Sequence, residues 1–373
     1  MQNYSGKKSL KSKFRLAIHF HKLAVKDIRQ ETDDCVSISF DIPPELESEF
    51  IFRQGQNITI KSTLLGEEIR RTYSICSSPL ENELRIAVKK VPDGAFSTFA
   101  NQQLKEGDIL EVLSPAGSFF TELNEANKKN YVFFAAGSGI TPLISIIKTI
   151  LLIEAESNVT LVFGNKTVSS IIFKEQLEAQ KDKHLQCFMI YHILSREKTE
   201  AEISYGRIDA DKCKQLSALI DYKKADEFFI CGPEQMIFTI KNFLESIGIT
   251  KNKIHFELFT TPKRGNIQIE TKTINTKDEG SNITVTLDGR SFNFTLDYDS
   301  NCILDAALAQ GADLPYACKG GVCTTCKAKL IEGKVDMEVN YGLEPEEVEA
   351  GFILTCQSHP RSNKVVVDFD VKS

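Results

Sequence analysis

The sequence lacks an apolar run long enough to cross a membrane. Its longest apolar stretch, 143–153, is short and contains Lys148, whereas a spanning helix needs about 20 consecutive apolar residues. The first 20 residues are basic, without a single acid, but they lack the apolar core and the small-residue cleavage site of a secretory signal. We therefore expect a soluble, cytoplasmic protein with a basic tail at 1–20 and no membrane partner.

Other absences narrow the possible function. We find no internal repeat, which excludes a repeat architecture, and no oxygen-activating iron motif, so any substrate oxidation is expected on another protein. The composition is ordinary, with 42% hydrophobic and 26% charged residues, which excludes wholesale disorder. No nucleic-acid partner is expected. A length of 373 residues is enough for two to three domains.

Four cysteines near the C-terminal end carry the most information. They follow the spacing C-x4-C-x2-C, a long gap and one more cysteine, and they are Cys318, Cys323, Cys326 and Cys356. This spacing is typical of plant-type [2Fe–2S] ferredoxins. Gly320 and Gly321 let the loop wrap closely around an anionic cluster, and Lys319 adds positive charge beside it. The alternatives are a zinc site or a disulfide framework, but structural zinc usually pairs two short knuckles, and here the fourth cysteine stands alone.

The other six cysteines are expected to be small buried side chains of a cytosolic protein. They are Cys35, Cys76, Cys187, Cys213, Cys231 and Cys302. Only Cys231 has a further role, because it follows an apolar strand expected at 227–230 and begins the segment Cys231-Gly232-Pro233. Ligands of open α/β sheets bind at the carboxyl ends of the strands.

Composition and periodicity divide the chain into domains. Strand-like runs at 36–40, 58–61, 84–88 and 109–113, separated by Gly, Pro and Asp turns, predict an antiparallel β-barrel over 21–125. Strands alternate with helices over 126–259, which predicts an α/β domain with a parallel sheet. A polar linker is expected at 260–280 and a ferredoxin domain at 281–373.

A phosphate-binding turn is predicted where the α/β domain begins. The apolar strand at 131–136 runs into Gly137-Ser138-Gly139-Ile140-Thr141-Pro142 and then into a helical stretch. The first-turn N–H groups and the helix dipole favour an anion, and glycine lets phosphate oxygens approach. Thr141 is predicted as the N-cap and Pro142 as the first helical residue. The alternative is a plain strand-to-helix turn.

The next two strand ends favour NADPH over NADH. The strand at 159–163 ends in Gly164-Asn165-Lys166, with no acid to hold a ribose 2′-hydroxyl. Ser195 and Arg196 follow the third strand and suit a 2′-phosphate. The alternative is a polar turn.

A flavin site is predicted in the barrel, because nicotinamide gives up two electrons as a hydride and a [2Fe–2S] cluster takes one at a time. In the segment 70–74, Arg71 can clamp a phosphate, Tyr73 can stack on the ring system and Ser74 can hydrogen-bond a ring nitrogen. A second segment, 93–98, opens a helix whose N-terminus suits a pyrophosphate.

The order of these motifs resembles the ferredoxin–NADP⁺ reductase superfamily. The motifs are R-x-Y-S, a Gly-Phe-Ser-Thr turn, G-x-G-I-T-P and C-G-P, and the C-terminal module adds a resemblance to oxygenase reductases. Within that class the chain resembles the reductase components of phenylacetyl-CoA epoxidase complexes, in the stretches ILDAALAQGADLPYACKGGVCTTCK, MEVNYGLEPEEVEAG and VVVDFD. The resemblance spans the chain from about residue 20 to its end.

The resemblance implies a multidomain fold with an FAD barrel, an NADPH-binding α/β domain and a β-grasp ferredoxin domain. It implies electron transfer from NADPH through FAD and the cluster to a di-iron oxygenase of phenylacetate degradation. The implied flavin positions are Arg71, Tyr73, Ser74, Val88, Gly94, Phe96 and Ser97. The implied nicotinamide nucleotide positions are Gly137, Gly139, Thr141, Pro142, Ser195, Arg196 and Cys231.

The resemblance also implies three catalytic residues, Ser74, Cys231 and Glu257. Cys231 is expected near the nicotinamide ring, and Glu257, in H-F-E-L-F, resembles an acidic residue near the flavin of many relatives. One departure concerns Lys166, because relatives often carry arginine there and lysine offers a point charge rather than a bidentate fork.

The motifs leave the electron acceptor open. A Rieske oxygenase, a desaturase or a hybrid-cluster protein is an alternative acceptor, since acceptor choice lies in surface shape and charge. A non-enzymatic redox sensor or carrier is disfavoured, because it needs no hydride donor site. The whole formal excess of negative charge, −6, lies within 281–373, where the run Glu344, Glu346, Glu347 and Glu349 either is a solvated helix face or steers a basic partner. The polar linker suggests a mobile ferredoxin domain.

Overall fold

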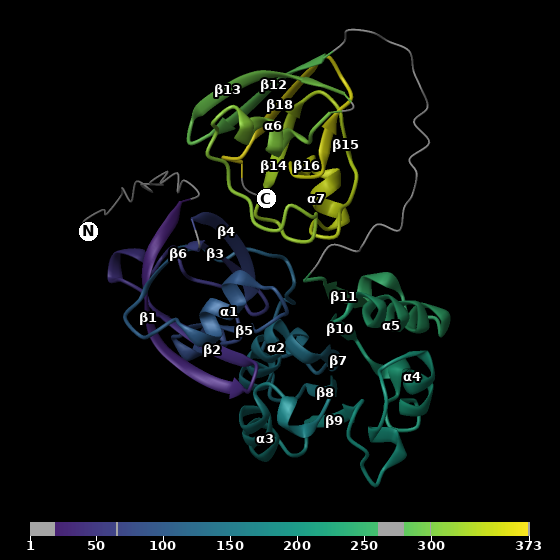
Figure 1. Ribbon diagram of the computed structural model, residues 1–373. Coiled ribbons are helices and arrows are strands. Elements are labelled where there is room, and N and C mark those ends of the chain that lie inside the picture. The colour runs from purple at the N-terminus through teal and green to yellow at the C-terminus, as the bar shows by residue number, and fades with distance from the viewer. Residues whose placement is uncertain (1–18, 65, 260–279, 299, 372–373) are drawn as a thin grey trace, which may run out of the picture.

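Three sheets form three units in the computed structural model, which describes residues 19–64, 66–259, 280–298 and 300–371. Figure 1 shows the first unit in purple and blue, the second in teal and green, and the third, in green and yellow, above both. The tail expected at 1–20 and the linker expected at 260–280 lie outside the described residues, apart from their last one or two positions. The predicted multidomain fold is confirmed.

The first unit is an antiparallel sheet of six strands in the order β4-β3-β6-β1-β2-β5. The strands are β1 (Phe20–Thr32), β2 (Cys35–Asp41), β3 (Asn57–Leu64), β4 (Glu67–Ser74), β5 (Leu84–Lys89) and β6 (Ile109–Leu113). Alternate residues of β2 such as Val36, Ile38 and Phe40 enter one apolar core. An isolated bridge between Ile75 and Ile86 joins the two edges, so the sheet closes into the predicted barrel, with helix α1 (Ala95–Gln102) packed on β5, β2 and β3.

The second unit is a five-stranded parallel sheet in the order β11-β10-β7-β8-β9. Its strands are β7 (Asn130–Ala136), β8 (Asn158–Asn165), β9 (Phe188–Leu194), β10 (Glu227–Cys231) and β11 (Ile254–Glu257). Its helices are α2 (Ile140–Ile153), α3 (Lys174–Lys183), α4 (Ala210–Leu216) and α5 (Glu234–Ser246). This is the α/β architecture that the alternation of strands and helices predicts.

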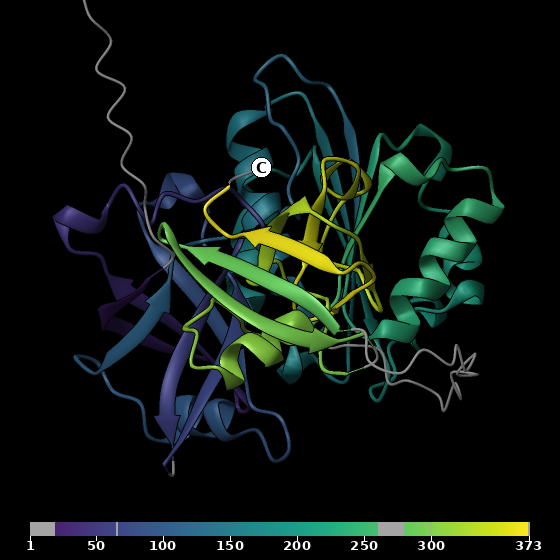
Figure 2. The ribbon, with the colours of Figure 1, turned by 90° about the horizontal axis from the view of Figure 1, so that it is seen from above.

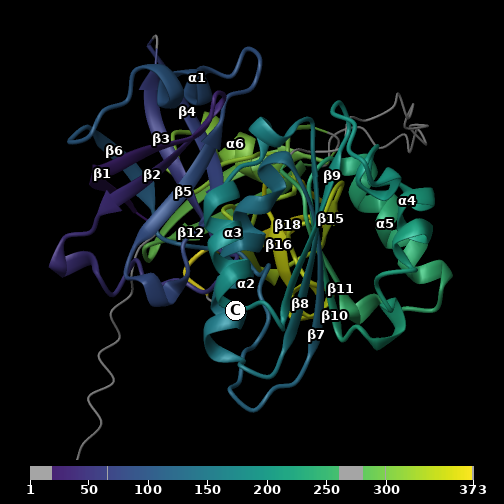
Figure 3. The same cartoon turned by 90° about the horizontal axis from the view of Figure 1, so that it is seen from below.

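Helices cover both faces of this parallel sheet, and the side chains of β7 alternate between them. Tyr131 and Phe133 pack in one core with residues of α2 and α3, while Val132 and Phe134 pack in another with residues of α4 and α5. Figure 3 shows α2 and α3 on the side nearest the viewer. Because the first core also takes Cys76 and Phe119 from the barrel side, the first two units share apolar packing.

The third unit is a mixed sheet in the order β13-β12-β18-β14-β16, in which β12 and β18 run parallel. Its strands are β12 (Gly280–Leu287), β13 (Arg290–Asp297), β14 (Lys327–Glu332), β16 (Phe352–Leu354) and β18 (Lys364–Asp368), with a separate pair β15 (Val335–Met337) and β17 (Ser358–Pro360). Helix α6 (Ile303–Ala309) packs into its core, and α7 (Pro345–Glu349) is a short surface helix. This is the predicted β-grasp arrangement. In Figure 2 the unit lies over the junction of the other two.

None of the helices within the described ranges has the length and apolar character that crossing a bilayer requires.

Glu154 is a buried acid whose carboxylate accepts several hydrogen bonds within the second unit. Its side chain is 1% exposed, directly after α2. One oxygen accepts from the Asn127 side chain at 2.6 Å, and the other from the Tyr131 hydroxyl at 3.0 Å and the Ser157 hydroxyl at 2.8 Å. A buried carboxylate with this many donors is stabilising as long as all the partners remain. Burial raises the pKa of Tyr131, and the neighbouring carboxylate of Glu154 raises it further.

We therefore expect Glu154→Ala to lower the free energy of unfolding by about 3 kcal/mol, because it leaves buried donors without an acceptor. Glu156→Ala is the matched control: Glu156 is exposed and, among the described residues, pairs only with Lys128, so its loss should cost less than about 1 kcal/mol. Urea unfolding of both variants measures the difference. Equal costs for the two variants would contradict the role of Glu154.

Candidate functional site

The four predicted cluster ligands gather in one place, as two pairs. Cys323 Sγ lies 3.1 Å from Cys318 Sγ, and Cys326 hydrogen-bonds Cys356. Two irons with two thiolates each match this pairing. In the part of the chain that the structure describes, no three His, Cys, Asp or Glu side chains converge as a mononuclear metal site requires.

The loop around these thiols is shaped to hold an anion. The backbone N–H of Gly320 donates to Cys318 Sγ at 3.3 Å. The pKa of Cys318 is lowered by the hydrogen bond from Cys323 and by backbone N–H groups, and the pKa of Cys356 is lowered by Cys326 and the N–H of Gly321. Gly321 has φ +73°, and a Cβ there would lie 2.7 Å from the carbonyl oxygen of Val339, so only glycine fits. These features suit a cluster bound by thiolates.

The predicted phosphate turn lies between β7 and α2. Gly137–Gly139 forms a 3₁₀ turn that continues into the helix. A Cβ on Gly139 would lie 2.1 Å from the carbonyl oxygen of Cys231, so glycine is required for the close packing of this turn against the end of β10. The strand, turn and helix are therefore where the sequence places them.

The predicted N-cap is wrong. Helix α2 begins at Ile140 with Gly139 as N-cap, which puts Thr141 and Pro142 at the second and third helical positions. The hydroxyl of Thr141 donates back to the carbonyl of Ser138 at 3.0 Å instead of accepting from the helix. The glycine-rich turn already has helical geometry, so the helix starts earlier, and a proline in its first turn loses no hydrogen bond.

The three predicted catalytic residues come together where the barrel meets the parallel sheet. Ser74, at the end of β4, donates to Glu257 Oε2 at 3.0 Å. Cys231 and Glu257 are paired residues at the ends of β10 and β11. Cys231 is fully buried, and burial raises the pKa of its thiol well above the ordinary value. It is therefore a neutral, polarizable neighbour rather than a thiolate.

Burial also raises the pKa of Glu257 to about 7, although hydrogen bonds from Ser74 and Asn57 oppose the shift. The glutamate is not the exposed strand-end side chain that is common at such positions. Asn57, on β3, was missed from the sequence, because nothing local marks an asparagine at a strand start as the partner of a carboxyl so far away in the chain.

The two predicted flavin segments meet in the barrel. The Tyr73 ring lies 5.6 Å from the ring of Phe96, a buried residue of α1. Gly94 is the N-cap of α1, and Ser97 donates to its carbonyl at 3.1 Å. Arg71 is exposed at this end of β4, and its guanidinium donates to its neighbour's carbonyl.

Val88 is placed differently from the other predicted flavin residues. Its side chain lies in the barrel core, and its carbonyl accepts from Asn101 at 3.0 Å. Its assignment as a flavin-binding residue stays a prediction.

The residues predicted to select NADPH meet at the carboxyl edge of the parallel sheet. The N–H of Ser195 donates to the carbonyl of Asn165 at 2.9 Å, and the N–H of Arg196 donates to that of Lys166 at 2.9 Å. The side-chain nitrogen of Asn165 is buried without a partner among the described residues. A nucleotide at this edge would supply the missing acceptor.

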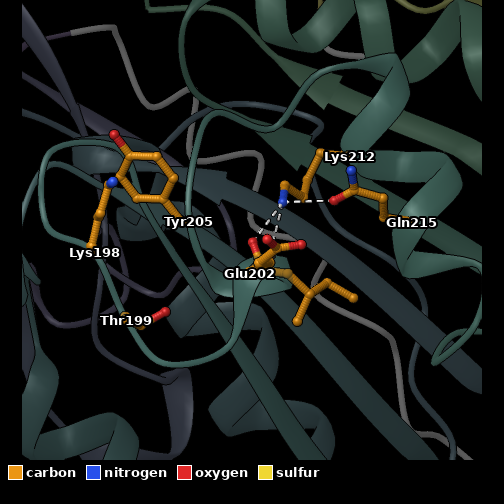
Figure 4. Close-up of a pocket in the computed structure, with 7 residues that line it drawn as sticks. Lys198, Thr199, Glu202, Tyr205, Lys212 and Gln215 are labelled. Carbon is orange, nitrogen blue, oxygen red and sulfur yellow. Dashed lines mark hydrogen bonds between the residues drawn. The ribbon is translucent and has the colours of Figure 1, made fainter.

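Residues that follow Arg196 in the chain line a cavity of about 820 Å³. It is lined by Lys198, Thr199, Glu202, Ile203, Tyr205, Lys212 and Gln215 (Figure 4). Tyr205 forms a β-bridge with Leu194, next to Ser195, and the residue is 39% exposed. The Lys212 ammonium donates hydrogen bonds to the Gln215 side chain and to a backbone carbonyl. Lys198, in contrast, is exposed. The sequence signal for this cavity was only the nearness of Lys198 and Tyr205 to Ser195 and Arg196.

Strand β4 links all three units. Alternate residues of a strand point to the same side. In β4, Arg70 and Ser74 contact other units, and Thr72 between them is linked to the ferredoxin unit through a second threonine. Arg70 donates to the carbonyl of Leu314 at 3.2 Å. The hydroxyl of Thr72 lies 3.2 Å from that of Thr59, which in turn lies 3.3 Å from that of Thr325 in the cluster loop. Ser74 donates a hydrogen bond to Glu257 of the second unit.

Family models match each unit. Residues 22–120 match an oxidoreductase FAD-binding domain, residues 133–242 an oxidoreductase NAD-binding domain, and residues 285–361 a 2Fe-2S iron-sulfur cluster binding domain. The predicted binding domains for FAD, a nicotinamide nucleotide and a [2Fe–2S] cluster are confirmed.

Known proteins match the chain over most of its length. It is 44% identical to one of the subunits of the 1,2-phenylacetyl-CoA epoxidase of Escherichia coli K12, over 95% of this chain and 98% of that protein. It is 33% identical to the ferredoxin reductase component of 3-ketosteroid-9-alpha-monooxygenase of Rhodococcus rhodochrous, over 93% and 96% of the two chains. The structure of phthalate dioxygenase reductase shares the fold, with a TM-score of 0.56 and 22% identity over 94% of this chain and 98% of that one.

The raised pKa of Glu257 predicts a pH-dependent stability. The unfolded carboxyl titrates near pH 4.5 and the folded one near 7, so between these values the unfolded state releases a proton that the folded state retains. The free energy of unfolding should therefore fall as pH rises from 4.5 to 7, by up to about 3 kcal/mol, and level off above.

Glu257→Gln keeps a neutral side chain at every pH and should abolish this fall. Exposed Glu125→Gln serves as control and should retain it. Urea unfolding over a series of pH values makes the comparison, and a parallel fall in wild type and Glu257→Gln would show that another group titrates.

Proposed function

Because this chain belongs to the oxygenase reductases that join an FAD domain, an NAD domain and a [2Fe–2S] ferredoxin domain, we propose that it carries electrons from NADPH to the oxygenase of a phenylacetyl-CoA epoxidase. The chain is an NAD(P)H-dependent electron-transfer oxidoreductase. What we propose in addition is the identity of the electron acceptor and the preference for NADPH over NADH.

The observation that supports electron transfer within this chain is the position of strand β4 between the other two units. At its end, Ser74 meets Glu257 of the nucleotide domain. Two residues earlier, Thr72 approaches the cluster loop through Thr59 and Thr325. Electron transfer through a flavin requires donor, flavin and acceptor to lie within reach of one another. The position of β4 meets this requirement.

FAD supplies the conversion of one hydride into two single electrons. The residues proposed to hold it are Tyr73, whose ring lies 5.6 Å from that of Phe96, Ser74, whose hydroxyl would hydrogen-bond a ring nitrogen, and the N-terminus of α1, which would bind the pyrophosphate. Cys231 and Gly139 form a close-packed, uncharged wall where the nicotinamide is proposed to lie. Glu257, with a pKa of about 7, is proposed to hold or release a proton beside Ser74.

The 44% identity to an epoxidase component over 95% of this chain supports the proposed acceptor. The test is reconstitution with the oxygenase components of a phenylacetyl-CoA epoxidase, in which NADPH consumption should depend on phenylacetyl-CoA. The steroid monooxygenase relative motivates the matched arm, a 3-ketosteroid oxygenase with its steroid. Reduction of an artificial acceptor without coupling to phenylacetyl-CoA would leave the reductase activity intact and reject the acceptor.

NADPH is the proposed donor, and cytoplasm is the proposed location. Lys198 lines the cavity of Figure 4, and exposed Arg196 stands two residues before it in the chain. The ring of Tyr205 offers a stacking surface for an adenine. All ten cysteines are free of disulfides, which is usual in a reducing compartment.

Arg196→Ala should raise KM for NADPH at least about tenfold, because a charge-assisted contact to the 2′-phosphate is lost. KM for NADH should change less than about twofold, because NADH has no such phosphate. Lys224→Ala, which removes an exposed lysine of the same unit outside the cavity, is the control. Steady-state reduction of an artificial acceptor gives KM for both nucleotides in the wild type and the two variants. An equal effect of Arg196→Ala on the two KM values would reject the NADPH assignment.

A further inference from the structure

Arg70 is a charged residue buried at the boundary between the barrel and the ferredoxin domain. Its side chain is 7% exposed. On the barrel side, Nε donates to Glu68 at 2.9 Å, and the guanidinium lies 5.1 Å from the ring of Phe20. A guanidinium is buried only where several groups receive it, so its remaining contacts define what it does.

Those remaining contacts are all with the ferredoxin domain. The guanidinium carbon lies 4.0 Å from the centre of the Tyr316 ring, and Nη1 donates to the carbonyl of Leu314 at 3.2 Å. Asp313 lies 3.8 Å from Nη2 but is 97% exposed, so its contribution is small. Stacking and a directed hydrogen bond at once require the flat, forked guanidinium, which a lysine does not offer.

The segment that Arg70 holds leads directly into the cluster loop. Tyr316 stands two residues before Cys318. At the other end of the loop, Thr325 lies between Cys323 and Cys326 and contacts Thr59 of β3 at 3.3 Å. Holding Leu314 and Tyr316 against β4 therefore fixes the loop beside the strand pair that carries Tyr73 and Ser74.

The rest of this boundary is loosely packed. A cavity of about 700 Å³ lies beside Arg70, between the barrel residues Phe20, Lys61 and Glu111 and the ferredoxin residues Leu287, Arg290 and Phe292. Beyond Arg70, the contacts across it include the single hydroxyl pair Thr59–Thr325 and an ion pair between exposed His19 and Asp288. A boundary of this kind resembles a transient interface, and its few directed contacts are concentrated at Arg70.

We propose that Arg70 is the positioning residue that clamps the ferredoxin domain onto the flavin domain, with the cluster loop against β3 and β4. It acts through Tyr316 and Leu314, and it is not part of hydride transfer. The inference rests on the reductase activity of the chain and not on which oxygenase accepts the electrons.

The first test reads docking directly. The chain contains no tryptophan, so Tyr316→Trp introduces a single indole under the Arg70 guanidinium. Its emission should be that of a partly buried indole. Adding Arg70→Ala should shift the emission to the red as the indole becomes solvated, whereas adding Arg29→Ala should not. Arg29 is half-exposed on the same barrel, and its ion pairs within the described ranges are with the barrel acids Asp27 and Glu83. Equal emission in the Arg70→Ala and Arg29→Ala proteins would overturn the proposal.

The second test separates positioning from structure by stopped-flow absorbance. In Arg70→Ala, flavin reduction by NADPH should stay within about twofold of wild type, while the following reduction of the cluster slows about tenfold, because one stacked, charge-assisted contact is lost. Arg70→Lys, which keeps the charge, should recover only part of the rate. Should Arg70→Ala fail to bind flavin and cluster, Arg70→Lys decides. Full wild-type rates of cluster reduction in the lysine variant, or in the alanine variant, would overturn the clamp, while the NADPH-dependent reductase activity would stand.

Discussion

The architecture depends on one strand that is shared by three units. The alternation of side chains along β4 sends Arg70, Thr72 and Ser74 to one side, and these residues meet the ferredoxin domain, the approach to the cluster loop and the nucleotide domain. Tyr73, on the other side, packs against Phe96 of α1. A single short segment thus fixes the relation of the donor, flavin and acceptor sites, because a rigid extended strand holds its residues at constant spacing.

The two redox sites are tuned in opposite electrostatic directions. At the junction of barrel and parallel sheet, where hydride transfer is proposed, burial raises the pKa of Cys231 and Glu257, so the thiol is neutral and the carboxyl is neutral below about pH 7. In the cluster loop, a neighbouring thiol and backbone N–H groups lower the pKa of Cys318. Hydride transfer needs orientation without competing charge, whereas metal ligation needs thiolates. Local burial and backbone direction produce both results within one chain.

The sequence predicts the features whose causes are local. Alternating apolar residues predict the barrel strands, and the spacing of Cys318, Cys323, Cys326 and Cys356 predicts the cluster domain, because both depend on residues close in the chain. The start of α2 was mispredicted since Thr-Pro is typical of a helix start, whereas the Gly137–Gly139 turn is already helical. The contacts of Asn57, Thr59 and Arg70 were missed because their partners lie far away in the sequence, and no periodicity or motif encodes them.

The acidic run of the ferredoxin domain shows why acceptor choice is harder to read than cofactor binding. Two of its four acids have structural duties: Glu347 forms a capping box with Glu344 in α7 and pairs with Lys327 at 2.8 Å. Burial raises the pKa of Glu344, and nearby His255 of the nucleotide domain opposes this shift. Only Glu346 and Glu349 remain as exposed charges without such a role in the described structure. Cofactors require fixed geometry and so leave motifs, while a partner protein requires only a complementary surface, to which many different residues can contribute.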